Sequence, residues 1–329
     1  MKKILLPAMI ILITLSCKRE QTEQQATNEN QEAITASTSY AEISRKEGGY
    51  WEGREYMEGY FKNVDTLVVP AEHTDHSWFI RYEGPGWENN QIGYRLYLDW
   101  RNAIDIFGKK VDTLVLPYVG QDGFDSYHEE QPWGQDILKA GKSMGIGGYG
   151  RILNDTVAHF RNVSNTTAVI ENLEGKSTIH IDYENWKTGN DSINLSTQLS
   201  ILASDRFTKA VLKPSREIEG LCTGIVKFEN VPLSKKEGAK WAYIATYGNQ
   251  TLVSDDDKLG MALFYRLGQV EQQKEGVNDH LVIFKPTTQE LTYYFLGAWE
   301  QEPNGIKNET DFFADLDQKL NTLENTNSL

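Results

Sequence analysis

Two segments of the chain concentrate the residue types that bind a charged, hydroxyl-rich ligand and move protons on it. In the first, residues 81–109, arginine, asparagine and tryptophan stand close together around a Gly-Pro-Gly turn at 84–86. Arginine offers a planar pair of donors to a carboxylate or a sulfate, and tryptophan can stack on a sugar ring. The segment predicts a binding wall, whose expected members are Arg81, Trp87, Glu88, Asn89, Asn90, Arg95 and Tyr97.

The same segment also fits a structural role, because acidic and basic residues are interspersed along it. Residues two apart on a strand share a face, so Arg95, Tyr97 and Asp99 should lie side by side. Such a face can hold ion pairs between strands, and we favour this role for Asp99, Arg101 and Asp105. For four side chains both roles stay open, namely Arg81, Asn89, Asn90 and Arg95.

The second segment, residues 127–150, carries the candidate for proton transfer. The imidazole of His128 titrates near neutral pH and lies outside any apolar run, although a single histidine in a loop is often merely exposed. Its neighbours favour a site, and they are Trp133, Asp136, Lys142 and Tyr149. We expect Glu88 and Asp136 to orient the reacting groups. The glycines between 145 and 150 predict close approach of the backbone to a ligand or to another strand.

A pair of histidines, His73 and His76, flanks Asp75 at a spacing that could hold a metal ion together with Asp75 or His128. The sequence does not define the remaining ligands of such a centre. Two histidines in a loop at the rim of a sheet explain the pattern more simply. We therefore expect no metal and no other cofactor, and we count His76 among the residues that contact substrate.

Short runs of β-branched and aromatic residues, each bounded by turn residues, recur along the chain after residue 40. Several alternate between apolar and polar residues, as in 179–183, which is typical of antiparallel strands with one buried face. We expect one all-β domain over 40–329, a large antiparallel β-sandwich. A C-terminal amphipathic helix is predicted at 311–323, where five apolar side chains share a face. A shorter helix is predicted after Pro132.

The beginning of the chain is typical of an exported lipoprotein. Two lysines precede an apolar stretch that ends at Ser16-Cys17, so we expect residues 1–17 to be a signal peptide and Cys17 the lipid-attachment residue. Residues 18–39 are polar and predict a disordered tether. The lipid anchor predicts a location at a membrane outside the cytoplasm, at the outer membrane or facing the periplasm. A formal net charge of -14 argues against nucleic acid as a partner.

Several motifs together resemble a known lipoprotein family, over essentially the whole folded region. They are Tyr82-Glu83-Gly84-Pro85-Gly86-Trp87-Glu88, Gly93-Tyr94-Arg95-Leu96-Tyr97-Leu98-Asp99, Asp105-Ile106-Phe107-Gly108-Lys109, His128 with Trp133-Gly134-Gln135-Asp136, and the stretch Gly145–Gly148. The family, long described as a domain of unknown function, occurs in polysaccharide-utilisation gene clusters and includes the ulvan oligosaccharide dehydratase. The resemblance implies a galactose-mutarotase-like β-sandwich. It also implies loss of water across C4 and C5 of a non-reducing-end glucuronate or iduronate, which leaves a 4,5-unsaturated uronate.

Such a reaction assigns roles by its chemistry. Abstraction of the C5 proton needs a base, for which we expect His128, and a cation that neutralises the neighbouring carboxylate as charge develops. The expected cations are Arg81, Arg95 and Lys142. The acid that protonates the leaving hydroxyl is expected to be Tyr149, Tyr97 or His76. The partner would then be an anionic oligosaccharide.

Other functions stay open at this point. A non-catalytic glycan-binding lipoprotein would use the same binding wall without turnover. A polysaccharide lyase abstracts the same C5 proton but expels a sugar instead of water, and the shape of the pocket decides between the two leaving groups. Paired carboxylates for glycoside hydrolysis also remain open, because the sequence does not show how far apart the acids lie.

Overall fold

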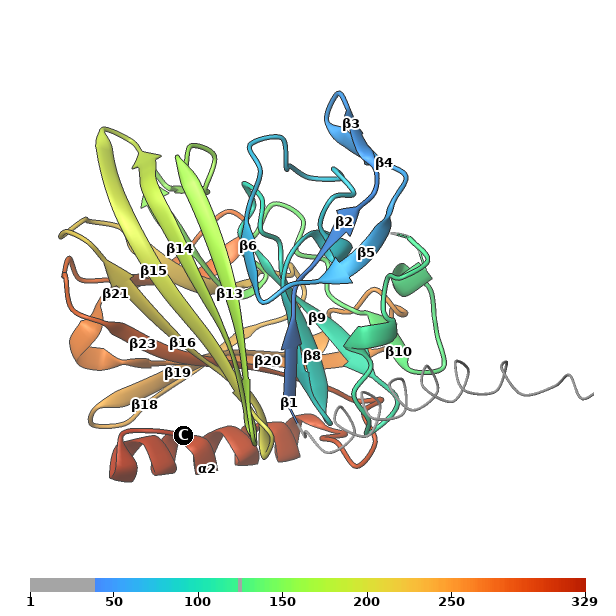
Figure 1. Cartoon of the computed structure of the whole chain (residues 1–329). Coiled ribbons are helices and arrows are strands. Elements are labelled where there is room, and N and C mark those ends of the chain that lie inside the picture. The colour runs from blue at the N-terminus through green and yellow to red at the C-terminus, as the bar shows by residue number, and fades with distance from the viewer. Residues whose placement is uncertain (1–38, 124–125) are drawn as a thin grey trace, which may run out of the picture. The chain divides into compact units, whose positions relative to one another are not determined.

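A computed structural model describes residues 39–123 and 126–329 of the chain (Figure 1). The predicted signal peptide with its lipid-attachment residue Cys17, and the tether up to residue 38, lie outside the described residues. Ser39, the last residue of the predicted tether, is the first residue of strand β1. Within the described residues, no helix is both long and apolar enough to cross a bilayer.

The largest element is a nine-stranded antiparallel sheet, which runs diagonally through Figure 1. In spatial order its strands are β18 (Leu233–Glu237), β19 (Trp241–Asn249), β20 (Lys258–Arg266), β23 (Leu291–Trp299), β16 (Asp205–Pro214), β15 (Asp191–Leu202), β14 (Lys176–Thr188), β13 (Asn165–Leu173) and β6 (Thr66–Val68).

Two five-stranded sheets pack against one face of the large sheet. The first contains, in spatial order, β1 (Ser39–Glu42), β7 (Gly86–Asn89), β8 (Ile92–Leu96), β9 (Ile104–Lys109) and β10 (Gly134–Asp136). The second contains β12 (Thr156–Ala158), β11 (Ile146–Leu153), β17 (Leu221–Val226), β22 (Asp279–Phe284) and β21 (Val270–Glu275). Two short ribbons complete the strands, β2 (Ser44–Glu47) with β5 (Tyr60–Asn63) and β3 (Tyr50–Glu52) with β4 (Glu55–Met57). The four 3-10 turns are η1 (Arg81–Glu83), η2 (Leu116–Tyr118), η3 (Ser126–His128) and η4 (Leu267–Gln269).

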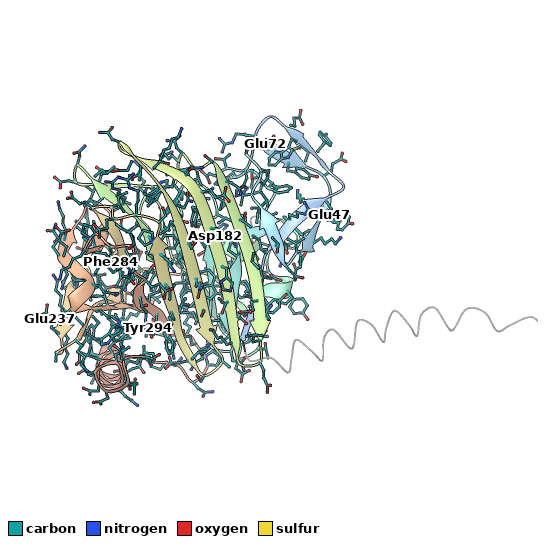
Figure 2. The ribbon with its side chains drawn as sticks, turned by 60° about the vertical axis from the view of Figure 1, so that its left-hand side comes forward. Glu47, Glu72, Asp182, Glu237, Phe284 and Tyr294 are labelled. Atoms are coloured by element: carbon teal, nitrogen blue, oxygen red, sulfur yellow. The ribbon has the colours of Figure 1, made fainter. Side chains whose placement is uncertain are left out.

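Alternation along the strands builds the main core. In β14, Ile179 and Ile181 are fully buried, whereas Asp182 lies on the outer face of the sheet (Figure 2). The inner faces of all three sheets contribute to one apolar cluster, which includes Tyr94 of β8, Ile146 of β11 and Ile181. The large sheet therefore has one dry face and one outer face.

The C-terminal helix α2 (Glu309–Thr326) covers part of that outer face. Beneath it lies a second apolar cluster of large side chains, among them Trp241, Phe264 and Tyr294, and Tyr294 is seen beside the helix in Figure 2. The helix extends beyond the predicted 311–323 because Asn308 caps its first turn and Asn327, in a left-handed conformation, ends it. The prediction of an all-β fold of large antiparallel sheets with a C-terminal helix is confirmed.

Two local predictions need correction or completion. The helix expected after Pro132 is wrong, because residues 134–136 pair with β9 as strand β10. The glycine-rich stretch approaches other strands, which resolves the open choice between strand and ligand. A side chain on Gly145 would overlap the carbonyl of Ile104, and one on Gly147 would overlap the ring of Phe295. The stretch belongs to β11, whose pairing with β17 contains a bulge between Ile146 and Tyr149.

Replacing Gly147 by alanine should therefore destabilise the fold through a steric clash. A Cβ on Gly147 would lie 2.2 Å from Cδ1 of Phe295, whereas one on Gly175, in the β13–β14 turn, would meet nothing within 4 Å. The two glycines have similar positive φ angles, +68° and +73°, so they share the backbone cost. We expect Gly147→Ala to lower the unfolding free energy by about 1–3 kcal/mol more than Gly175→Ala in urea denaturation. Equal losses would contradict the packing described here.

Candidate active site

Three neighbouring strands place charged side chains on one face of the first five-stranded sheet. Arg95 of β8 lies directly opposite Asp105 of β9, and Asp136 of β10 lies opposite Phe107 of β9. Directly opposed residues share a face, and so do residues two apart on one strand. Arg95, Asp105 and Asp136 are therefore collected on the face of this sheet that points away from the main core.

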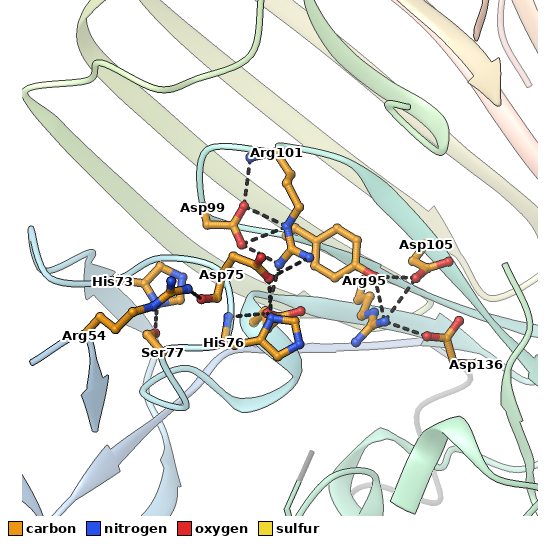
Figure 3. Close-up of polar contacts among 12 residues, drawn as sticks. Arg54, His73, Asp75, His76, Ser77, Arg95, Asp99, Arg101, Asp105 and Asp136 are labelled. Carbon is orange, nitrogen blue, oxygen red and sulfur yellow. Dashed lines mark hydrogen bonds and ion pairs between the residues drawn. The ribbon is translucent and has the colours of Figure 1, made fainter. Parts of the chain in front are cut away.

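The guanidinium of Arg95 joins these groups into one cluster (Figure 3). Its Nη2 lies 2.6 Å from Asp136 Oδ2 and 3.0 Å from Asp105 Oδ2, and it donates to the hydroxyl of Tyr97 at 2.8 Å. Nη1 donates to the hydroxyl of Tyr127 at 3.0 Å, and Tyr97 donates to Asp105 at 2.7 Å. We call these five buried residues the Arg95 cluster.

Burial controls the protonation of this cluster. Desolvation and the neighbouring charge of Asp136 raise the pKa of Asp105, although Arg95 and the hydrogen bond from Tyr97 oppose the shift. Burial also raises the pKa of Tyr97 and of Tyr127 above the usual range, against the opposing effect of Arg95. Both phenols therefore keep their protons at neutral pH, and the proton of Tyr97 is donated to Asp105.

His128 forms the solvent-facing end of the same cluster. Its side chain is 35 % exposed, and its Nδ1 lies 3.1 Å from Asp136 Oδ2. The imidazole also contacts the ring of Tyr127, with 4.5 Å between ring centroids. Asp136 thus contacts His128 and Arg95 at once. A histidine that is accessible on one side and contacts a buried carboxylate at Nδ1 has the arrangement of a general base held in one tautomer.

A second arginine extends the network toward His76. Arg101 pairs with Asp99 at 2.5 Å, with Glu83 at 2.9 Å and with Asp75 at 3.1 Å. Its guanidinium lies 3.9 Å from the centre of the Tyr97 ring, while that of Arg95 lies 4.7 Å from the same ring. Tyr97 therefore connects the two arginine networks. The ion pairs that we favoured for Asp99, Arg101 and Asp105 are present (Figure 3).

The predicted histidine pair separates into two different environments. His76 Nδ1 lies 2.5 Å from Asp75 Oδ1, and the ligand atoms of Asp75, His76 and Glu83 lie within 4.8 Å of one another. Arg101 already pairs with both of these carboxylates, which supplies the cation that they need. His73 instead contacts the hydroxyl of Ser77 at 2.8 Å, and burial lowers its pKa to about 4. The geometry therefore gives no reason to place a metal ion here.

Two residues of the predicted binding wall, Trp87 and Asn89, are fully buried on the inner face of the sheet. The Trp87 indole stacks on Tyr94 in the main core, with 5.6 Å between centroids, and donates to Thr208 Oγ1 at 2.8 Å. The amide of Asn89 donates to two carbonyls of the β15–β16 connection, those of Leu202 and Asp205. Both side chains lie on the inner face, opposite to Arg95. These two side chains therefore hold β7 against the large sheet. The next residue of the predicted wall, Asn90, is partly exposed.

Glu88 lies on the same face as Arg95 but in a separate buried ion pair. Its carboxylate lies 2.7 Å from Lys109 Nζ and accepts hydrogen bonds from the backbone of Val115 and Leu116, each at 2.7 Å. Burial raises its pKa, and Lys109 opposes the shift. We expected Glu88 to orient reacting groups, whereas it holds the chain before η2.

The remaining predicted residues have contacts of their own in other parts of the fold. Arg81 is fully buried and pairs with Glu42, so its charge is already neutralised. The hydroxyl of Tyr149 lies 2.9 Å from that of Tyr183 inside the core, where neither reaches solvent. Lys142 is exposed and lines a hollow together with Trp100. Trp133 is partly buried and packs edge-to-face on Phe107, beneath Arg95.

The sequence did not single out Tyr127 or Glu83 as members of the site. Tyr127 directly precedes His128, and that adjacency was the available signal. Glu83 lies in η1 with a positive φ of 70°, and no sequence pattern predicts this backbone conformation.

A comparison with protein families finds one match over nearly the whole chain. The matching family model carries the description "Domain of unknown function (DUF4861)" and covers residues 9–327. No curated protein matches the sequence.

The buried charges of the Arg95 cluster predict a strong loss of stability when the cation is removed. Arg95→Leu would leave the buried carboxylates of Asp105 and Asp136 without the arginine that pairs with both, and we expect a loss of about 3–5 kcal/mol in unfolding free energy at pH 7. The loss should be smaller at pH 5, because unpaired buried carboxylates have raised pKa values and become neutral as the pH falls. Urea denaturation at both pH values measures it.

Arg216 provides the matched control. It is 57 % exposed and pairs with Asp191 at 3.3 Å. An exposed ion pair contributes little, so Arg216→Leu should cost less than about 1 kcal/mol at either pH. A similar loss for both variants would show that the Arg95 cluster is not a desolvated charge network.

Proposed function

The chain belongs to the DUF4861 family, and we propose that it is an oligosaccharide dehydratase. It would remove water across C4 and C5 of a non-reducing-end uronic acid, such as the glucuronate or iduronate of ulvan-type oligosaccharides, and leave a 4,5-unsaturated uronate. The observation that carries the proposal is the pairing of half-exposed His128 with buried Asp136 beside two protonated phenols.

His128 is the proposed base. Contact between its Nδ1 and the Asp136 carboxylate favours the tautomer whose Nε2 lone pair can accept the C5 proton. The same carboxylate stabilises the imidazolium that forms. Arg95 holds Asp136 in place, because it pairs with that carboxylate at 2.6 Å.

Tyr97 is the proposed acid. Its proton would pass to the C4 oxygen as the C4–O bond breaks, so that water leaves and the C5–H electron pair becomes the C4–C5 double bond. The phenolate left behind would accept hydrogen bonds from Arg95, whose Nη2 lies 2.8 Å from the hydroxyl oxygen. Transfer of the proton from His128 back to Tyr97 through solvent would complete the cycle.

The substrate carboxylate needs a cation of its own. Arg95 already pairs with two carboxylates, and Arg101 pairs with three. The charge of each guanidinium is therefore already neutralised by carboxylates of the protein and is not available to the substrate. Positive side chains outside the Arg95 cluster must therefore neutralise the acidic sugar.

The test follows product formation from saturated uronate-terminated oligosaccharides. The wild type should raise the short-ultraviolet absorbance typical of conjugated uronates, with a mass loss of one water. His128→Ala should lower kcat by about 10²–10⁴-fold, the usual contribution of a general base. His180→Ala is the matched control, because its side chain is 36 % exposed and lies on the outer face of the large sheet near Glu171. It should keep full activity.

Three outcomes would overturn the proposal. The absence of any absorbance change with uronate-terminated substrates would leave a glycan-binding protein as the alternative. Shortened chains in place of dehydrated ones would identify a polysaccharide lyase. Full activity of His128→Ala would show that His128 is not the base.

The proposal also includes the lipid anchor, which would hold the enzyme at a membrane. Cys17→Ser should abolish incorporation of labelled palmitate and move the protein from the membrane fraction to the soluble fraction. Cys222→Ser is the control, because Cys222 is the other cysteine of the chain and is buried. Membrane association that survives Cys17→Ser would contradict the anchor.

A further inference from the structure

Two adjoining hollows form a groove over Trp100 and Arg161. One has a volume of about 450 Å³ and is also lined by Lys142 and Lys187, and the other has about 420 Å³ and is also lined by His73. Trp100 and Arg161 line both hollows, so the two are neighbours. We call this feature the Trp100 groove. Each hollow falls within the range of about 300–1,000 Å³ typical of small-molecule sites.

The groove carries positive charge without matching negative charge. Among the described carboxylates, none lies within ion-pair distance of Lys142, Arg161 or Lys187, and all three side chains are exposed. This arrangement occurs in a chain with a formal charge of -14. A local cluster of cations can attract an anionic ligand in spite of the opposite global charge.

The acidic residues at the groove are already compensated. Asp155 pairs with Lys274, and Asp99 pairs with Arg101. Asp279 is buried and accepts a hydrogen bond from the backbone of Met144 at 2.9 Å, and burial raises its pKa to about 7. Lys142, Arg161 and Lys187 are thus the exposed charged side chains of the groove that belong to no ion pair among the described residues.

Arg161 is held in position for recognition. Its guanidinium lies 3.7 Å from the centre of the Trp100 ring, and Trp100 packs edge-to-face on His159 at 5.7 Å. His159 in turn contacts the carbonyl of Arg101 through Nδ1 at 2.8 Å. A stacked guanidinium loses little freedom on binding, and its planar donors match a carboxylate or a sulfate.

The other end of the groove offers a hydrogen-bonding atom without a partner. Nε2 of His73 is buried and has no hydrogen-bond partner among the described residues, while Nδ1 contacts Ser77. The groove borders the Arg101 network, because Asp99 lines it and pairs with Arg101.

We propose that the Trp100 groove binds the anionic sugars next to the reacting uronate, with Arg161 and Lys187 as ligands for their carboxylate or sulfate groups. The chemical class of this ligand rests on the proposed function. Arg161 and Lys187 are binding residues, and their loss should act on substrate affinity and not on the chemical step. Lys142 extends the cationic wall of the same groove.

The test measures binding of a sulfated uronic-acid tetrasaccharide and of its desulfated counterpart to the full-length protein by calorimetry. Arg161→Gln combined with Lys187→Gln should weaken binding at least tenfold and reduce its dependence on salt. Lys176→Gln is the matched control. Lys176 and Lys187 are exposed residues at opposite ends of β14, roughly 36 Å apart at about 3.3 Å per residue. Because charges are screened within about 8 Å at physiological salt, the control should bind within twofold of wild type.

The outcomes separate this inference from the proposed function. A raised KM with unchanged kcat in the double variant supports both. Unsaturated product formed with an unchanged KM overturns the groove and leaves the dehydratase intact. Binding that the double variant loses, without any unsaturated product from wild type, supports the groove and overturns the dehydratase. Loss of binding on desulfation supports the groove with sulfate as its ligand, and equal binding supports it with carboxylates.

Discussion

The charge balance around Arg95 constrains the rest of the site. A single guanidinium pairs with two carboxylates and donates to two phenols on the covered face of a sheet, where an unpaired charge would be costly. This arrangement fixes Asp136, and Asp136 in turn contacts the imidazole of His128. The position of the half-exposed His128 side chain thus depends on the buried pair of Arg95 and Asp136 behind it.

The same balance divides the work between two regions. Buried arginines act as parts of the framework, since their charges are consumed by carboxylates of the protein. Exposed cations on loops and strand ends remain available to a ligand. Arg95 and Arg161 illustrate the contrast, because the first is buried among carboxylates and the second stacks on Trp100 beside two unpaired lysines. Arg95 thus contributes to stability and Arg161 to recognition, although each of them stacks on an aromatic ring, that of Tyr97 and that of Trp100 respectively.

Local sequence patterns predicted what depends on local periodicity. Period two correctly placed Arg95 and Tyr97 on one face, and the apolar stripe of the last segment identified the helix over most of its length. The burial of Trp87 and Asn89 depends on which sheet covers β7, and that information lies in strands more than a hundred residues away. The place of Tyr149 in the core depends on Tyr183, whose hydroxyl it meets 34 residues further along the chain. The Trp100 groove could not be predicted from the sequence. It is lined by segments that are far apart in the chain, among them the loop before β9, the residues before β11 and the C-terminal end of β14.

The helix α2 has a consequence for how the chain reaches its native state. It seals aromatic side chains of β19, β20 and β23 from water, and it is the last described segment to be synthesised. Until this helix has been synthesised, the apolar side chains of the strands beneath it are exposed and favour self-association. Even a short truncation within the helix should therefore be more harmful than the polar exterior of the helix suggests.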